Sequence, residues 1–382
     1  MSEITSTVPR QDWVDEPISE VGQMSQWKLM RLRFMRNKLA MIGFFGLVVM
    51  YLIVAFAGFL APNHYMTQNQ DYAWGPPSKI TFINTEGKLT LRPHMYEIKS
   101  VLDPAQFRFV FDVDENVRIP IYFFVRGDEY TLFGRFTSNV HLFGVKDGHR
   151  IYPFGADGLG RDMFARTLQG GQISMTVGLV GVSLSIILGS IMGTVSGYYG
   201  GLTDDIMQRV IEVIMAFPTV PLWAALAAAL PPLSESFTAL HRYFLITIIL
   251  SLVTWTGLAR QLRAKVMSYN QADFTQAALA AGASDARIIF VHMLPNAASH
   301  IIVVAALAIP GMILGETALS FLGLGILPPL VSWGALLRVA QQLPVVINSP
   351  WMLFPGGAVV ITVLFFTFLG DGLRDAVDPY SI

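Results

Sequence analysis

Long apolar segments dominate the pattern of hydrophobic and polar positions along this chain. A bilayer core of about 30 Å is crossed by roughly 20 apolar residues in helical form. Six segments reach that length: 39–61, 172–198, 207–230, 243–264, 298–324 and 352–371. The pattern predicts an all-α integral membrane protein with six transmembrane helices. Pro218 and Pro221 fall inside the third segment, where the missing backbone N–H of proline predicts an interrupted helix.

The segment between the first two apolar stretches, residues 62–165, has a different pattern. Apolar and polar residues alternate over 79–91 and 107–134, which is the period of a strand with one buried face. The alternation is broken at 86–87 and at 126–128 by glycine beside charged residues, which predicts hairpin turns. We therefore expect a β-rich insert after the first span. Its role stays open between packing against the spans, seating a soluble delivery protein and covering the mouth of a pore.

Positive charge is distributed unequally around the apolar segments. Cations precede the first segment, follow the last one, and cluster between the end of the fourth and the start of the fifth: Lys28, Arg31, Arg33, Arg36, Lys38, Arg260, Arg263, Lys265, Arg287 and Arg374. Loops that stay in the cytoplasm carry an excess of lysine and arginine. The bias predicts that both termini and the 265–296 loop are cytoplasmic and that the 62–165 insert is extracytoplasmic.

The remaining boundaries follow from composition. Residues 1–25 are polar and mildly acidic, and we expect a disordered cytoplasmic tail there without a cleaved signal peptide. Residues 26–61 hold an interfacial helix and the first span, because "WKLMRLRFMRNK" mixes cations with large apolar residues. A simple positive flank to the span is the alternative. Residues 166–382 form a five-span core.

Composition removes several functional classes. The chain is 53% hydrophobic and 14% charged with a net charge of −1, and its mean hydropathy is +0.50. This favours a membrane protein and argues against nucleic acid as a partner. The sequence contains no cysteine, no phosphate-binding G-x-x-x-x-G-K-[ST] loop and no H-E-x-x-H zinc motif. We expect no catalytic residue, no metal site and no cofactor in this chain.

The 265–296 loop has the most specific pattern. Residues 276–296 are "QAALAAGASDARIIFVHMLPN", which predicts a short helix over 273–281 that Gly282 ends and a second helix that Ser284 and Asp285 cap. Leu294-Pro295 is expected to turn the chain into the fifth span. A short, stiff, water-facing helix tied to two spans suits a handle moved by a partner. A surface loop that only packs on the bundle is the alternative.

Residues 276–295 resemble the "EAA" loop of permease subunits of bacterial ATP-binding-cassette importers. Ala277, Ala278, Gly282, Leu294 and Pro295 match that motif, and Gln276 stands where the family usually has glutamate. The resemblance implies a coupling helix that docks on an ATPase subunit. The coupling residues it implies are Phe274, Gln276, Ala277, Ala278, Gly282, Asp285, His292, Leu294 and Pro295.

Further stretches narrow the subfamily. Residues 36–43, 154–181, 315–337 and 351–379 are similar to dipeptide, oligopeptide and nickel importer permeases, of the C-type in each pair. The resemblance covers about 36–62 and 152–379, so the insert lies largely outside it. It implies a type I importer fold and a bacterial cytoplasmic (inner) membrane location. It also implies a peptide substrate, or an oligosaccharide or nickel chelate.

The same resemblance implies the partners. A homologous second permease, two ATPase subunits that bind ATP and Mg, an extracytoplasmic solute-binding protein and membrane lipid would complete the transporter. Two other classes stay open from sequence. One is a stand-alone transporter driven by an ion gradient, and the other is a membrane-anchored scaffold whose insert is the functional part.

Acidic residues within the apolar segments are candidates for the translocation path. A charge at the centre of a membrane helix costs roughly 2.5–3.5 kcal/mol, so such a residue usually faces protein or water. Glu316 in the fifth segment is the first candidate and Glu212 in the third is the second, with Met312 and Ser320 beside Glu316 on the same helix. The alternative is that each acid is satisfied inside the bundle.

Overall fold

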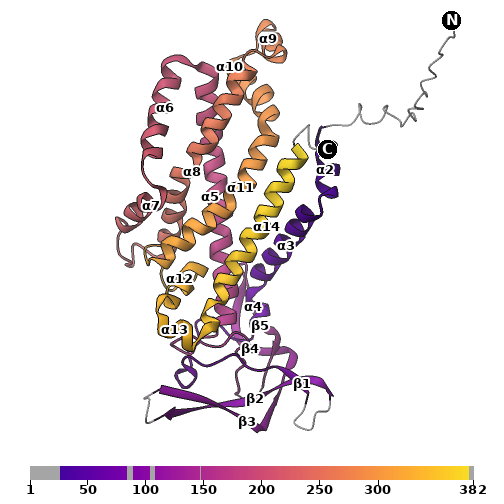
Figure 1. Ribbon diagram of the computed structural model, residues 1–382, viewed down its shortest axis with the longest axis vertical. Coiled ribbons are helices and arrows are strands. Elements are labelled where there is room, and N and C mark those ends of the chain that lie inside the picture. Colours follow the sequence, from indigo (N-terminus) through magenta and orange to yellow (C-terminus); the bar gives the residue numbers. More distant parts are fainter. Residues whose placement is uncertain (1–25, 84–88, 104–107, 147, 378–382) are drawn as a thin grey trace, which may run out of the picture.

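The predicted apolar segments form the helices of an elongated bundle in the computed structural model, which describes residues 26–83, 89–103, 108–146 and 148–377 (Figure 1). Within this part of the chain, five helices are long and apolar enough to cross a membrane, and one bent helix pair passes the same test of length and composition as a broken sixth span. The prediction of six spans is therefore confirmed. The tail predicted at 1–25 lies outside the described residues.

The helices of the bundle follow one another with short connections. Their bounds are α2 (Gln26–Arg36), α3 (Lys38–Ala55), α4 (Ala57–Leu60), α5 (Met163–Tyr199), α6 (Gly201–Ala216), α7 (Thr219–Ala228), α8 (Ala239–Tyr269), α11 (Leu294–Phe321) and α14 (Phe354–Val377). Three shorter helices lie between α8 and α11: α9 (Asp273–Ala280), α10 (Asp285–Arg287) and the π-helix η2 (Ile288–Met293). Between α11 and α14, the chain forms α12 (Trp333–Leu337), η3 (Val339–Gln341), α13 (Leu343–Asn348) and η4 (Pro350–Leu353).

The third span is broken where the sequence predicted an interruption. Helices α6 and α7 meet at an angle of 86°, with Phe217 and Pro218 extended between them. Proline cannot donate the backbone hydrogen bond that would continue α6, and it disfavours helical backbone in the residue before it. Pro221 causes no second break, because it sits in the first turn of α7, where a missing N–H costs nothing.

Helices α5 and α8 form the centre of the bundle. Three glycines of α5, spaced by four residues, face the backbone of α8, and a Cβ at any of them would collide with a carbonyl oxygen of that helix: Gly189, Gly193 and Gly197. Small residues at this spacing let two membrane helices approach closely. The main apolar cluster, with Val177, Leu250, Met312 and Leu319, joins α5, α8 and α11. These three helices therefore behave as one packed unit.

The insert is β-rich, as the alternation predicted. Strands β1 (Thr81–Ile83), β2 (Leu89–Asp103) and β3 (Arg108–Pro120) form one antiparallel sheet, and β4 (Tyr122–Leu132) pairs with β5 (Phe136–Gly144) in another. The turn predicted at 86–87 lies outside the described residues. The turn predicted at 126–128 is wrong, because β4 runs through these positions and its hairpin turn follows Leu132.

Asp128 fastens the insert to the chain that leaves the first span. Its Oδ2 accepts hydrogen bonds from the backbone N–H of His64 (2.9 Å) and from Nη1 of Arg150 (3.2 Å). Burial by itself would raise the pKa of the Asp128 carboxyl, but these hydrogen bonds and the charge of Arg150 outweigh it and hold the pKa below its usual range. Packing requires glycine at position 127, since a Cβ there would lie 2.9 Å from the His141 ring. Contacts between distant segments therefore explain the 126–128 sequence.

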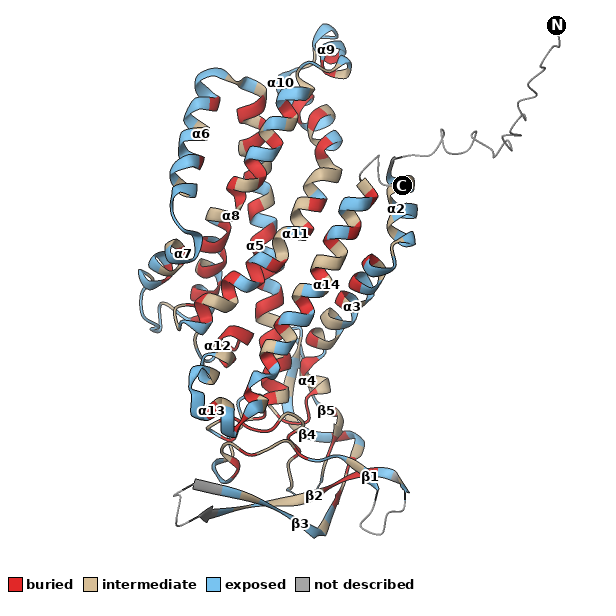
Figure 2. Ribbon diagram, in the orientation of Figure 1, coloured by how far each residue is buried: buried red, intermediate tan, exposed pale blue. Residues whose placement is uncertain are grey.

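The two sheets and the short helix α9 lie at opposite ends of the bundle (Figure 1). Helix α2 packs beside the end of α14, toward the end that carries α9. The outer faces of α3 and α6 are exposed (Figure 2), although their side chains are apolar: Leu39, Ile42, Phe45, Val49 and Leu52 on α3, and Leu202, Ile206, Val210 and Val213 on α6. A wide exposed apolar surface on a helical bundle is what lipid or another membrane chain covers.

Candidate coupling site

The loop between α8 and α11 is built around α9 (Asp273–Ala280), which projects from the end of the bundle (Figure 1). Gly282 follows α9 with φ +77°, a left-handed conformation that only glycine adopts without a Cβ penalty. The N–H of Gly282 donates to the carbonyl oxygen of Leu279 (2.9 Å), and the N–H of Ala283 donates to that of Ala278 (3.0 Å). This pair of bonds is a Schellman motif, so the helix end predicted at Gly282 is confirmed.

The next helix begins where the sequence predicted, but it continues past the predicted turn. The Ser284 side chain accepts the N–H of Arg287 and caps α10. From Asp285 the chain then stays helical to Phe321, so the turn expected at Leu294-Pro295 is wrong. The π-helix η2 precedes Pro295, and its wider turn relieves the crowding that a proline ring imposes on the carbonyl four residues earlier.

Buried side chains join α9 to the helices on both sides of it. One apolar cluster contains Val266 of α8, Ala278 of α9, and Ile288 and Met293 of η2. Phe274 packs against this cluster and meets Tyr269 edge-on, with ring centroids 5.8 Å apart. This packing ties the position of α9 to the ends of α8 and α11.

Polar contacts extend the connection to α5. The Asn270 side-chain amide donates to the carbonyl oxygens of Gly197 (3.0 Å) and Tyr198 (3.3 Å). The Tyr198 hydroxyl donates to Oδ1 of Asp285 (2.8 Å). Nε2 of Gln276 donates to the backbone carbonyl of Asn270 (2.7 Å), a bond that glutamate at this position could not form. The loop is thus tied to three spans.

The exposed side of α9 is small and smooth. Gln276, Ala277 and Ala280 are exposed, as is Ala281 after the helix. Methyl groups let another protein surface come close, and they offer no acid, base or nucleophile for chemistry. The arrangement can therefore act as a contact surface.

Three large apolar residues of the loop were not among the predicted coupling residues. Leu279, Phe290 and Val291 are 45%, 62% and 56% exposed. Their neighbours Ile288 and Ile289 are buried. His292 is half-buried in the same turn. Exposed leucine, phenylalanine and valine beside an alanine surface extend the possible contact area.

The first candidates for the translocation path lie inside the bundle. Glu316, Met312 and Ser320 are each at most 1% exposed. Oε2 of Glu316 accepts a hydrogen bond from Ser174 (2.9 Å), Oε1 accepts one from Ser320 (2.6 Å), and the N–H of Trp333 donates to Ser174 (3.2 Å). Within the single chain, Glu316 is satisfied by hydroxyl groups and joins α5, α11 and α12.

The other candidate and the nearest cavity have different surroundings. Glu212 is exposed on α6 and pairs with Arg209 (2.8 Å). Ser320 also lines a cavity of about 320 Å³, which three arginines border: Arg161, Arg166 and Arg338. This cavity connects the α11 hydroxyl that binds Glu316 with the loops that precede α12.

The fold and the site together define a class. Among the described residues, no group of three or more His, Asp or Glu side chains is placed to hold a metal ion. Six membrane crossings, with a short contact helix held by three of them, are the features of a membrane-embedded transport subunit. The described polar groups at the candidate site serve as caps and interhelical bonds.

The comparisons with known proteins specify this class. Residues 185–380 match the family model "Binding-protein-dependent transport system inner membrane component", and residues 25–77 match "N-terminal TM domain of oligopeptide transport permease C". The chain belongs to the family of binding-protein-dependent transport system inner membrane components. It is a non-catalytic permease subunit.

Curated relatives agree with this membership. The oligopeptide transport system permease protein OppC of Bacillus subtilis is 31% identical over 357 residues, which cover 93% of this chain and 90% of the relative. OppC of Haemophilus influenzae is 42% identical over 228 residues, and the dipeptide transport system permease protein DppC of Alkalihalophilus pseudofirmus is 38% identical over 227 residues. Each of these two matches covers 59% of this chain, with 70% and 71% of the relatives. Because the first match spans 93% of the chain, it takes in most of the insert.

Proposed function

We propose that this chain is one of the two permease subunits of an ATP-driven importer that moves peptides into a bacterial cytoplasm. The relatives named for oligopeptide and dipeptide transport support the substrate class. The proposed complex adds a homologous second permease, two ATPase subunits that bind ATP and Mg, and an extracytoplasmic solute-binding protein. Broad exposed apolar faces on α3 and α6 support a location within lipid and against a second permease.

The proposed orientation places the α9 end in the cytoplasm of a bacterial inner membrane. Lysine and arginine residues flank the spans at this end, on α2, at the end of α8 and at the end of α14. The insert at the opposite end would face outward, and both termini would be cytoplasmic. Since the chain has no native cysteine, the variants Ala280→Cys and Glu115→Cys can each be labelled with a membrane-impermeant maleimide. In inside-out vesicles the first should react and the second should not, whereas the reverse pattern would overturn the orientation.

The observation that carries the coupling proposal is the attachment of one exposed helix to three spans. Closure of the ATPase subunits around ATP would press on the alanine face of α9. The apolar cluster with Val266 would pass the displacement to α8 and α11, and the Asn270 bonds would pass it to α5. Their movement would open the path alternately to each side of the membrane. The residues proposed to take part are Phe274, Gln276, Ala277, Ala278, Gly282, Asp285, His292, Leu294 and Pro295.

The translocation path is proposed to lie between this chain and the second permease. Ser320 and the cavity with three arginines would open toward the insert side. Glu316 and Met312 would influence the path from within the bundle, through the serine bonds that hold α5 and α11 together. Glu212, exposed on α6, would face the second permease or the path itself.

A bulky residue on the proposed docking face tests the assignment. Ala277→Trp should lower the amount of ATPase subunit that co-purifies with the permease pair, because indole replaces a methyl group at the contact. Glu115→Trp is the matched control, since Glu115 is also exposed but lies on the insert. Undiminished ATPase association in Ala277→Trp would contradict docking at α9.

The insert is proposed to help seat the solute-binding protein. Deleting residues 80–145 removes all five strands and leaves the α9 loop unchanged. The deletion should impair uptake from the loaded binding protein more than it impairs ATPase association. The opposite result, lost ATPase association with normal capture, would reverse the assignment.

A further inference from the structure

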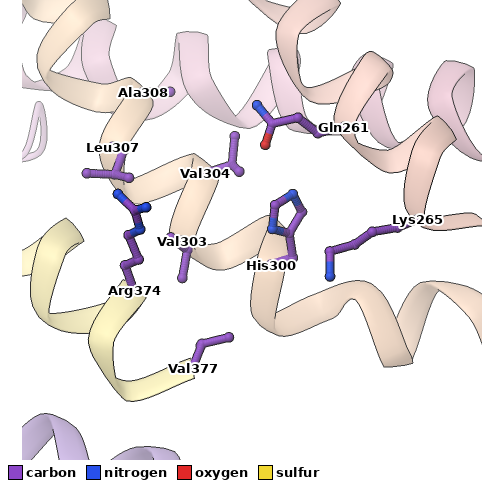
Figure 3. Close-up of a pocket in the computed structure, with 9 residues that line it drawn as sticks. All are labelled: Gln261, Lys265, His300, Val303, Val304, Leu307, Ala308, Arg374 and Val377. Atoms are coloured by element: carbon purple, nitrogen blue, oxygen red, sulfur yellow. The ribbon is translucent and has the colours of Figure 1, made fainter. Parts of the chain in front are cut away.

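A large cavity opens between α8, α11 and α14 near the end of the bundle that carries α9 (Figure 3). Its volume is about 730 Å³, which falls in the range of sites for small organic ligands. The coupling mechanism uses none of the residues that line it: Gln261, Lys265, His300, Val303, Val304, Leu307, Ala308, Arg374 and Val377.

The polar side of this cavity is basic. Lys265 and His300 lie on one side of the space, and Arg374 lies on the other (Figure 3). No acidic residue is among those that line the cavity, and within the described part of the chain neither Lys265 nor Arg374 forms an ion pair. Nε2 of His300 is buried without a hydrogen-bond partner among the described residues. The cavity therefore presents positive charge that no ion pair among the described residues compensates.

The described acids of α14 lie outside the lining of the cavity. Asp371 and Asp375 share α14 with Arg374 but do not line the cavity. Asp375 accepts a hydrogen bond from Asn37 (3.2 Å), on the side of α14 that faces the first span. A bound anion would balance the positive charge of the described lining.

The remaining walls are apolar and come from α11 and the end of α14: Val303, Val304, Leu307, Ala308 and Val377. Leu307 is 38% exposed on a helix that crosses the membrane. A ligand that fits must therefore carry a negative group beside a hydrocarbon part. Phospholipids with anionic headgroups combine both, and they are at hand where helix ends meet the membrane surface.

We propose that this cavity binds the headgroup of an anionic phospholipid of the cytoplasmic leaflet, with its phosphate between Lys265 and Arg374 and its acyl chains along α11. The leaflet rests on the proposed orientation, which cysteine labelling tests separately. The lipid would hold α14 against α8 and α11, the two helices that carry the α9 loop. Its binding would thus stiffen the bundle where the ATPase subunits act on it.

Lipid retention by the whole importer complex tests the proposal. The complex is reconstituted in nanodiscs of phosphatidylcholine with and without phosphatidylglycerol, and bound phosphatidylglycerol is counted by native mass spectrometry. Each cation near a membrane surface contributes about 1 kcal/mol to binding an anionic lipid, which is roughly fivefold in affinity. Lys265→Gln should therefore lower phosphatidylglycerol affinity about fivefold, and Lys265→Gln with Arg374→Gln roughly 25-fold. Lys265→Arg should retain wild-type affinity.

Arg260→Gln is the matched control, because Arg260 lies on the same helix but does not line the cavity. Equal loss in Arg260→Gln and Lys265→Gln, or no loss in the double variant, would overturn the proposal. A second measurement uses Ala308→Cys in the cysteine-free chain. Its thiol should react with a phospholipid that carries a maleimide on an acyl chain, whereas protection of the thiol from this lipid in the assembled complex would overturn the proposal by showing that protein fills the cavity.

Discussion

Replacing Gly282 isolates the backbone turn on which the coupling proposal depends. Gly282 has φ +77°, and a Cβ built there would meet nothing within 4 Å. Substitutions therefore act through backbone strain alone. For an ordinary residue, the left-handed conformation costs about 1–2 kcal/mol, which lowers the population of the intact turn by roughly 5- to 30-fold relative to an unravelled one. Gly282→Ala should show this intermediate effect.

Two further variants bracket the effect. Gly282→Asn should stay near wild type, because asparagine tolerates the left-handed conformation. Gly282→Pro cannot form the turn at all, since proline fixes φ near −65° and removes the N–H that bonds to Leu279, a loss of about 3 kcal/mol or more. It should uncouple ATP hydrolysis from transport without unfolding the bundle.

The assay is the ratio of peptide taken up to ATP hydrolysed by the complete importer in proteoliposomes. The ratio should fall in the order wild type, Asn, Ala, Pro, while ATPase association persists. A proline variant with wild-type coupling would refute the idea that the conformation at residue 282 transmits force. Loss of both peptide uptake and ATP hydrolysis in a variant would mean that its complex no longer assembles, and thermal unfolding of the permease pair distinguishes that case.

Three other perturbations have defined outcomes. Gln276→Glu cannot donate to the Asn270 carbonyl, so hydrogen exchange of the amides around residue 276 should rise by about five- to tenfold, for a bond of about 1 kcal/mol; unchanged exchange would count against that bond. Glu316→Gln places an amide N–H₂ where the hydroxyl of Ser174 or of Ser320 now donates. The free energy of unfolding, measured by thermal unfolding, should therefore fall by about 1–3 kcal/mol. Asp128 has a pKa below its ordinary 3.8, so it stabilises the insert above that pH and loses this effect as the pH falls through the lower folded value. Amide hydrogen exchange in the insert should thus be faster in Asp128→Asn than in the wild type at neutral pH, and this difference should vanish in acid.

Local signals predicted much of the fold and part of the site. Spans of twenty apolar residues have few alternative structures, and Gly282 and Ser284 end and begin helices through bonds to residues within four positions. The π-helix was not predictable in this way, because a proline such as Pro295 can either end a helix or distort it, and the local sequence does not distinguish the two. A missed local signal is the glycine series 189–197, whose four-residue spacing indicates close helix packing.

Long-range contacts set the rest. The alternation of apolar and polar residues is interrupted at 126–128 although strand β4 continues there. The reason is that residue 127 lies against the His141 ring and Asp128 bonds to a segment 64 residues earlier. Glu316 was recognisable as a buried acid, but its partner Ser174 is 142 residues away. The tie from Asn270 to α5 spans 73 residues. Sequence patterns of one or two turns carry no information about such pairs.

The length of α5 has a consequence for the order of events in transport. Its 37 residues make a single rod of about 55 Å at 1.5 Å per residue. One tip lies next to Asp162 beneath the sheets, and the other contacts Asn270 and Asp285. In the proposed orientation, a loaded solute-binding protein docked on the insert would tilt the same helix whose other end is bonded to the α9 loop, where the ATPase subunit would dock. ATP would then be hydrolysed chiefly when substrate has been delivered, and no separate signalling element would be needed.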